Sequence, residues 1–342
     1  MDSITATLPS TKDLILEFSR QNHKPLLSPW FNRQLETFIR EGFFISADRL
    51  AEVSQSIIDR LRAYREQTPV STAVLGMSGG VDSALTAALF KAGGWRVIGV
   101  TMPIHQNDEE TQRGIEACRA LGIEHLHIDL SSMFDAMISA QEKIDPALVE
   151  AGVQEVRIRR GNIRARLRMI TLYNLAHAHG GIVASTDNRS ELGAGFWTIC
   201  GDVGDISPIQ ALLKSWEVPY LAMLNGVPES TWRAMPTDGL AVLAGGDEAQ
   251  LGASYLEWDI MTEALSDAVQ MGADSQDRAA ELLEIQPGTR EAEVLAAVYR
   301  RMGRTWFKRI GAIKFPHPSD DDRYAALERI DAKFFIPHAA VA

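Results

Sequence analysis

One short segment, residues 71–90, constrains the fold of this chain more than any other. Ala73-Val74-Leu75 is an apolar run that ends at a glycine, and apolar residues then recur at positions 85, 88 and 89. The first pattern is typical of a buried strand and the second of a helix, so the segment predicts a strand, a tight turn and a helix. We expect functional residues in that turn, which would lie at the carboxyl end of the strand.

The turn reads Ser-Gly-Gly-Val-Asp-Ser over residues 78–83. Two glycines allow a left-handed backbone, and the hydroxyls join the free N–H groups of the helix start, which together predict a phosphate site. The sequence has neither the lysine of a Walker loop nor the spacing of a dinucleotide fingerprint. Asp82 would repel a triphosphate unless a divalent cation bridged them, which implies magnesium. The alternative is an ordinary glycine-rich turn with Asp82 as a helix cap.

Composition limits the possible partners and location. The chain has 342 residues, is 46% hydrophobic and carries a net charge of −11, which argues against nucleic acid as the main partner. It has no apolar run of membrane-spanning length and no secretory pattern at its N-terminus, so we expect no membrane partner and a cytoplasmic location. Cys118 and Cys200 lack the spacing of a zinc site or a disulfide framework.

Apolar runs and helical periodicity alternate along the chain and predict an α/β fold with a parallel central sheet and helices on both faces. The expected strands are 73–75, 96–101, 125–130 and 181–186, and the expected helices include 46–67, 109–121 and 156–178. Residues 1–45 are expected to form an N-terminal arm. Its aromatic residues would leave apolar surface exposed in a single chain, which predicts a homodimer through Trp30, Phe38, Phe43 and Phe44.

Several further motifs follow in order and extend the pattern. They are 161–166 (Gly-Asn-Ile-Arg-Ala-Arg), 185–191 (Ser-Thr-Asp-Asn-Arg-Ser-Glu), Gly195-Phe196, 205–208 (Asp-Ile-Ser-Pro), Lys214, Pro236-Thr237, Asp247-Glu248 with Leu251-Gly252, and Lys308-Arg309. With the loop at 78–83, this series resembles the ammonia-dependent NAD synthetases of the ATP pyrophosphatase family, whose fold is Rossmann-like. The resemblance runs over about residues 46–318, which we take as one domain, with 319–342 as a C-terminal tail.

The resemblance implies a role for particular residues. Asp82 and Lys214 would be catalytic, and Asp82 and Glu191 would hold magnesium. Arg166, Asp205 and Lys308 would contact deamido-NAD. The resemblance assigns ATP to Gly76, Met77, Ser78, Gly79, Gly80, Val81, Asp82, Ser83, Thr186, Lys214 and Thr237. The segment 235–248, rich in glycine and carboxylates, is a candidate lid.

The chain departs from the family pattern near the expected dinucleotide site. Ile199 stands where the bacterial enzymes usually have a lysine, and Phe307 where a histidine often precedes the lysine. The glycine loop at 201–205 is one residue shorter and has Val203 in place of a glycine. These departures concern the binding of deamido-NAD and leave the ATP residues intact.

The implied reaction is the amidation of deamido-NAD to NAD by ATP and ammonia, through an acyl-adenylate, with release of pyrophosphate and AMP. The roughly seventy residues before the phosphate loop are too few for a glutaminase domain of ordinary size, and whether a separate glutaminase supplies ammonia is left open. One alternative is a ligase of the same type that adenylates a different carboxylic acid. Another is a degenerate nucleotide-binding or regulatory protein, against which the intact Asp82, Glu191 and Lys214 speak.

Overall fold

A sheet of four parallel strands lies at the centre of the molecule, in the order β3-β2-β1-β4. The structure is a computed structural model that describes residues 9–19, 27–149, 154–236 and 246–311. The strands are β1 Thr72–Gly76, β2 Arg96–Thr101, β3 Glu124–His127 and β4 Ile182–Val183. The predicted parallel α/β architecture is therefore confirmed.

The helices account for most of the remaining described chain. In sequence order they are α1 Thr11–Ser19, α2 Pro29–Glu41, α3 Ala47–Gln67, α4 Val81–Ala92, α5 Asp108–Leu121, α6 Ser131–Glu142, the 3-10 helix η1 Pro146–Val149, α7 Gln154–Ala178, α8 Arg189–Ala194, α9 Glu217–Leu224, α10 Glu229–Trp232, α11 Gly246–Leu251, α12 Tyr255–Gln270, α13 Gln276–Leu282 and α14 Arg290–Arg309. Among the described residues, none of these helices is long and apolar enough to cross a membrane.

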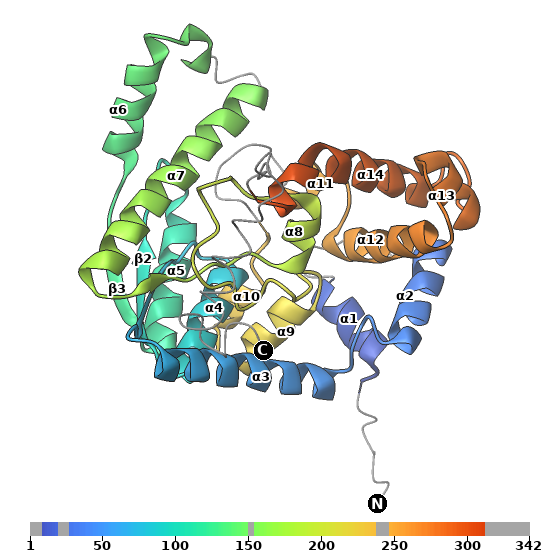
Figure 1. The fold of residues 1–342 in the computed structure, drawn as a ribbon, viewed down its shortest axis with the longest axis horizontal. Helices are drawn as coiled ribbons and strands as arrows, with labels where there is room; N and C mark the ends of the chain where they lie inside the picture. Colours follow the sequence, from blue (N-terminus) through green and yellow to red (C-terminus); the bar gives the residue numbers. More distant parts are fainter. Residues whose placement is uncertain (1–8, 20–26, 150–153, 237–245, 312–342) are drawn as a thin grey trace, which may run out of the picture.

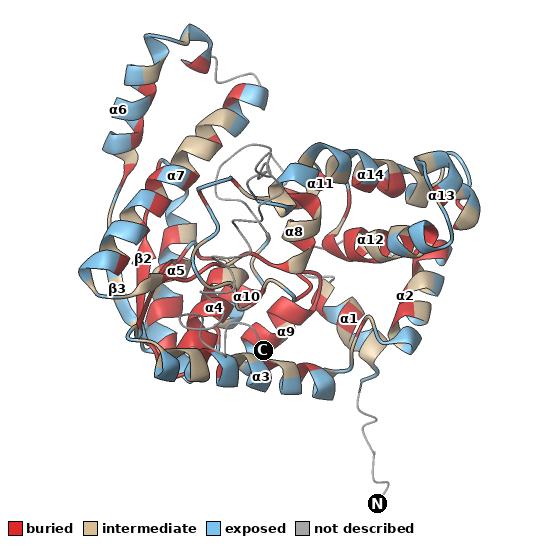
Figure 2. Ribbon diagram, in the orientation of Figure 1, coloured by how far each residue is buried: buried red, intermediate tan, exposed pale blue. Residues whose placement is uncertain are grey.

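The side chains of β1 point alternately to the two faces of the sheet, and the core accordingly has two layers. Ala73 and Leu75 pack with α3, α4, α5 and α9 on one face of the sheet. Val74 packs with α6 and α7 on the other face. Because successive side chains of a strand point to opposite faces, a strand buried on both sides reads as the continuous apolar run seen at 73–75. Figure 2 shows buried residues concentrated on β1, β2, α4 and α9, whereas β3 and α6 are largely exposed.

The predicted elements agree with the structure except at the outer strands. Ser46 caps α3, since its side chain accepts a hydrogen bond from the backbone N–H of Arg49. The third strand ends at His127 instead of residue 130, and the fourth covers only Ile182–Val183. β4 is short because the chain leaves the sheet at Ala184, which makes a single bridge to Ile206.

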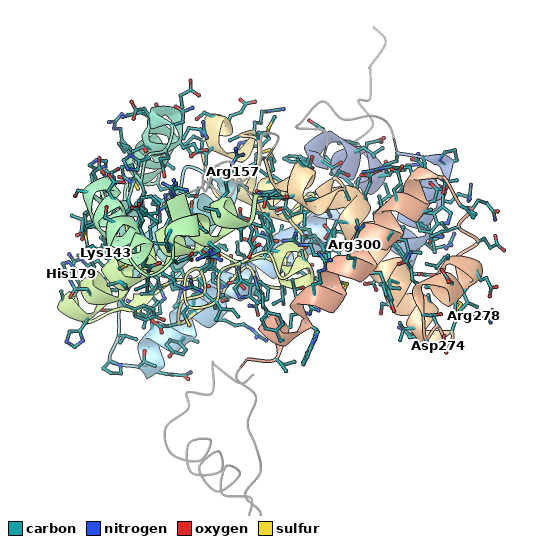
Figure 3. All side chains as sticks on the ribbon, turned by 90° about the horizontal axis from the view of Figure 1, so that it is seen from above. Lys143, Arg157, His179, Asp274, Arg278 and Arg300 are labelled. Atoms are coloured by element: carbon teal, nitrogen blue, oxygen red, sulfur yellow. The ribbon has the colours of Figure 1, made fainter. Side chains whose placement is uncertain are left out.

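The C-terminal helices form a second group beside the sheet. α12 packs against α14 and α2, and α14 packs against α8 and α13. Figure 1 shows this group on the side of the molecule opposite α6 and α7. In Figure 3, Asp274 and Arg278 accordingly lie at one end of the molecule, and Lys143 and His179 at the other. α7 of one group and α14 of the other contribute residues to the same pocket.

The N-terminal aromatic residues are buried within their own chain. Trp30, Phe38 and Phe44 are 4%, 2% and 1% exposed, and the indole N–H of Trp30 donates to the Leu283 carbonyl at 3.0 Å. The expectation that they stay exposed in a single chain is wrong, because α12 packs against α2 and Leu283 contacts Trp30. The homodimer stays a prediction without this support. The division into an arm at 1–45, a domain at 46–318 and a tail also stays a prediction, and residues 312–342 lie outside the described chain.

Candidate active site

The turn between β1 and α4 has a geometry that only glycine permits. Gly79 has φ +85°, and a Cβ there would lie 2.1 Å from the carbonyl oxygen of Glu110. Gly80 is the N-cap of α4 and has no side chain to bond the first N–H groups of the helix. The loop therefore presents unbonded donors at a helix start, where an anion is favoured by both hydrogen bonding and the helix dipole.

Asp82 does not cap this helix. It lies in the first turn of α4, and its carboxylate accepts a hydrogen bond from the Asn188 side-chain amide at 3.0 Å and forms an ion pair with Lys214. The interpretation of Asp82 as a simple helix cap is thus wrong. The side chain is directed instead toward residues more than 100 positions away in the chain.

Glu191 joins the same cluster from the start of α8. Asn188 and Glu191 form a reciprocal capping box, in which Asn188 Oδ1 accepts the Glu191 N–H at 3.0 Å. One carboxylate oxygen of Glu191 lies 3.8 Å from Lys214 Nζ. Asp82, Glu191 and Lys214, predicted together from the sequence, are therefore brought into one site.

Burial and mutual repulsion shape the charge of this cluster. Burial, followed by repulsion from Asp82, raises the pKa of Glu191 well above its ordinary value, although Lys214 opposes both effects. Burial alone would lower the pKa of Lys214, but attraction to Asp82 and Glu191 outweighs it and the pKa is raised. Lysine is thus held charged between two carboxyl groups that it cannot fully neutralise.

These two carboxylates fit a magnesium ion by the chemistry of their oxygen donors. Among the described residues no group of three or more histidine, cysteine or acidic side chains could hold a metal on its own. Magnesium is usually held by only one or two protein carboxylates, with phosphate oxygens and water completing its octahedron. Asp82 and Glu191, beside the phosphate loop, match that pattern.

A third buried carboxylate lies beyond Lys214. Asp247 is 3% exposed and accepts a hydrogen bond from the Tyr255 hydroxyl at 3.0 Å. The ring centroid of Tyr255 lies 5.8 Å from Lys214 Nζ. Burial and the charge of Asp247 raise the pKa of Tyr255 well above 10, so this phenol stays protonated.

The segment that carries Lys214 is held from behind by buried polar groups. The Lys214 backbone N–H donates to Ser190 Oγ at 3.0 Å, and the Leu213 N–H donates to Glu217 Oε2 at 2.9 Å. Burial raises the pKa of Glu217 to about 7. Asp259 lies beside Ser190, and burial raises its pKa to about 6.

A pocket of about 370 Å³ opens over this cluster. Of the residues expected to bind ATP, every described one lines it, namely Gly76, Met77, Ser78, Gly79, Gly80, Val81, Asp82, Ser83, Thr186 and Lys214. Thr237 lies outside the described residues, as does most of the candidate lid. Lys308 lines the far wall from α14, where its ammonium donates to the carbonyls of Gly195, at 2.8 Å, and Trp197.

Two of the expected substrate residues lie beside the pocket instead of lining it. Arg166 is exposed, and its Nε donates to the Ile199 carbonyl at 3.2 Å. Asp205 accepts hydrogen bonds from the Val183 N–H at 2.8 Å and the Tyr173 hydroxyl at 3.0 Å. Its carboxylate is thus bonded to the last residue of β4. Ile199 and Phe307 are each 43% exposed.

Sequence reasoning missed several side chains that line the pocket, chiefly Gln106, Arg113, Arg168 and Arg301. The sequence of α7 carries several arginines, but their spacing did not reveal that Arg168 turns to the sheet, where its Nε donates to the Met102 carbonyl at 3.1 Å. Arg113 had no signal of its own, since one basic residue in an acidic helix start is typical of any exposed helix.

Comparison with known proteins identifies one family. A family model described as NAD synthase matches residues 53–309. The NH3-dependent NAD+ synthetase of Thermoplasma acidophilum is 35% identical over 221 residues, which are 63% of this chain and 85% of that protein. The enzyme of the same description from Methanosarcina mazei is 36% identical over 234 residues, covering 65% and 84% of the two chains.

Solved structures of two synthetases share the fold of this chain. An NMN synthetase from Francisella tularensis superposes with a TM-score of 0.63 at 27% identity, over 78% of this chain and 99% of that one. An NH3-dependent NAD synthetase from Campylobacter jejuni, in complex with nitrate, gives a TM-score of 0.57 at 25% identity, with the same coverage.

Proposed function

The chain belongs to the NAD synthase family, and we propose on this basis that it converts deamido-NAD to NAD with ATP and ammonia. The fold is that of the ATP pyrophosphatases, and the described residues that we expect to bind ATP all line one pocket. The single observation that carries the proposal is the junction of the phosphate loop with the buried group of Asp82, Glu191 and Lys214.

In the first step, the nicotinate carboxylate attacks the α-phosphorus of ATP, the bond to the β-phosphate breaks, and pyrophosphate leaves. A carboxylate and a triphosphate repel each other, so the protein must position both and offset their charge. The loop N–H groups and Lys214 serve this purpose on the phosphate side. In the second step ammonia attacks the acyl carbon of the adenylate, AMP leaves, and nitrogen gives up a proton to form the amide.

Magnesium is part of this proposal. Asp82 and Glu191 would hold the ion, which would supply positive charge to the phosphate oxygens. Lys308, Arg166 and Asp205 are proposed to bind the dinucleotide, with Lys308 inside the pocket and the other two beside it.

A homodimer and a cytoplasmic location also remain proposals. For the dimer, exposed apolar side chains on α6 and α7, including Met133 and Ile170, give some support.

The test is a product balance. With deamido-NAD, ATP, magnesium and ammonium, the purified chain should form NAD, AMP and pyrophosphate in equal amounts and no ADP. Omitting deamido-NAD should stop pyrophosphate release. Formation of ADP, or pyrophosphate release that ignores deamido-NAD, would refute the proposed reaction. Glutamine should replace ammonium poorly when no partner protein is present.

The acid itself needs a separate comparison. Because one structural neighbour is described as an NMN synthetase, nicotinic acid mononucleotide is the appropriate competing substrate. We expect a higher kcat/KM for deamido-NAD. A preference for the mononucleotide would mean that the adenylation chemistry is as proposed but that the acid substrate is the mononucleotide instead of deamido-NAD.

A further inference from the structure

We propose that Arg113 of α5 binds the β- and γ-phosphates of ATP and the pyrophosphate that leaves. This inference rests on the proposed function, since it concerns the ATP consumed there. It adds a phosphate-binding residue from an element that the sequence motifs of the site do not include.

Arg113 is fixed against the phosphate loop by close packing. The first turn of α5 approaches the loop so closely that a Cβ on Gly79 would meet Glu110 O at 2.1 Å and the Arg113 Cβ at 3.3 Å. Arg113 Nε donates to the Gly79 carbonyl at 3.3 Å. The half-buried side chain lines the same pocket as residues 76–83. A guanidinium has five N–H donors in a planar fork, so this bond leaves the terminal nitrogens for a ligand.

The charges around the loop show why a further cation is needed. Lys214 shares its charge with Asp82 and Glu191. Glu110 lines the same wall as Arg113 and adds negative charge there. A triphosphate carries several negative charges, of which one magnesium ion offsets only a part. Without Arg113, acidic side chains would dominate the surroundings of the terminal phosphates, and the released pyrophosphate would be repelled.

The other described cations that line the pocket are bonded elsewhere. Arg301 donates to the Ala194 carbonyl at 3.0 Å, and Lys308 to the Gly195 carbonyl at 2.8 Å, both at the end of α8. Arg168 donates to Gln106 at 2.7 Å, beyond the end of β2. Among these cations, Arg113 is the one bonded to the backbone of the phosphate loop.

A simpler account is that Arg113 only braces the loop through Gly79. The substitution Arg113→Gln separates the two accounts, because glutamine carries its amide nitrogen on Cδ, as arginine carries Nε. The variant keeps a donor for the Gly79 carbonyl and removes the charge and the terminal nitrogens. Arg113→Lys keeps the charge without the planar fork. Arg119→Gln is the matched control, since it removes a charge from an exposed position on the same helix.

The experiment measures binding of magnesium pyrophosphate and of AMP to the full chain by calorimetry, and the KM for ATP in the NAD assay. Arg113→Gln should weaken pyrophosphate binding, and raise the KM for ATP, by about tenfold or more, the usual effect of losing a charge-assisted hydrogen bond. AMP lacks the phosphates in question, so its affinity should stay within about twofold. Arg113→Lys should lie between wild type and Arg113→Gln, and Arg119→Gln should match wild type.

Three results would overturn the inference. The first is wild-type pyrophosphate affinity in Arg113→Gln, which would indicate bracing alone. The second is an equal loss of AMP and pyrophosphate affinity, which would indicate a general disturbance of the loop. The third is a wild-type chain that binds no pyrophosphate. Failure of the proposed function has a different signature. In that case wild type would form no NAD, while pyrophosphate binding would still depend on Arg113.

Discussion

Glu217 lies behind Lys214 and offers a stability test whose size depends on pH. It is 5% exposed, and its carboxyl oxygen accepts the Leu213 N–H at 2.9 Å. Burial raises its pKa from 4.5 to about 7, and nearby Asp259 adds to the effect. Between these two values the unfolded chain loses the proton while the folded chain keeps it.

The folded protein therefore becomes less stable as pH rises through this range. The unfolding free energy contributed by the protonated group is fully present below pH 4.5 and is lost by about pH 7, since the folded state binds more protons in between. The loss is about 3 kcal/mol, because each unit of difference in pKa corresponds to about 1.4 kcal/mol. Above pH 7, Glu217 is a buried anion whose main compensation is one backbone N–H.

The substitution Glu217→Gln removes this titration and keeps an oxygen that can accept the Leu213 N–H. Urea unfolding should show wild type and variant within about 1 kcal/mol of each other at pH 5, and the variant more stable by about 3 kcal/mol at pH 8. Glu229→Gln, at an exposed position of α10, is the control and should show no such pH dependence. If wild type and Glu217→Gln lose stability in parallel from pH 5 to pH 8, Glu217 is not the group that titrates and the reasoning fails.

Three further substitutions test the phosphate loop, the metal site and the dinucleotide site. Gly79→Ala should cost more unfolding free energy than Gly226→Ala and should abolish ATP turnover, because both glycines have positive φ but only Gly79 has a backbone oxygen 2.1 Å from the added Cβ. Comparing urea midpoints of the two variants isolates the clash. Asp82→Asn should remove turnover at every magnesium concentration, and wild-type kcat would contradict its metal role. Ile199→Lys should lower the KM for deamido-NAD about ten- to a hundredfold with kcat unchanged, and an unchanged or higher KM would show a pocket built around the apolar residue.

Local sequence was sufficient where neighbouring residues build the structure themselves. The strand, turn and helix of 72–92 and the cap of α3 at Ser46 depend on residues within a few positions of one another. Burial of the N-terminal aromatics was a different case. An apolar stripe shows that a helix face must be covered, but it does not identify the cover. Here α12 and Leu283 of the same chain supply it instead of a second copy.

The pairing of Asp82 with Lys214 spans 132 positions and was predicted only through the family resemblance. Nothing in the local sequence distinguishes Glu217 or Asp259 from ordinary acidic residues of exposed helices. Their importance comes from burial, which depends on how α9 and α12 pack and is encoded in no short window. Arg113 is similar, because its role depends on the approach of α5 to Gly79.

Glu217 and Asp259 both lie in the elements that hold the backbone at Lys214. Replacing Glu217 with an apolar side chain would remove a costly buried acid but would leave the Leu213 N–H without its acceptor, and Leu213 immediately precedes Lys214. Asp259 stands beside Ser190, which accepts the N–H of Lys214 itself. The protein thus carries an unfavourable charge at neutral pH in the elements that fix the backbone of Lys214. Glu217→Gln should therefore gain stability and keep its kcat, provided that the amide oxygen accepts the Leu213 N–H as the carboxylate does. A loss of kcat that accompanies the gain in stability would show that the charge of Glu217 itself sets the position of Lys214.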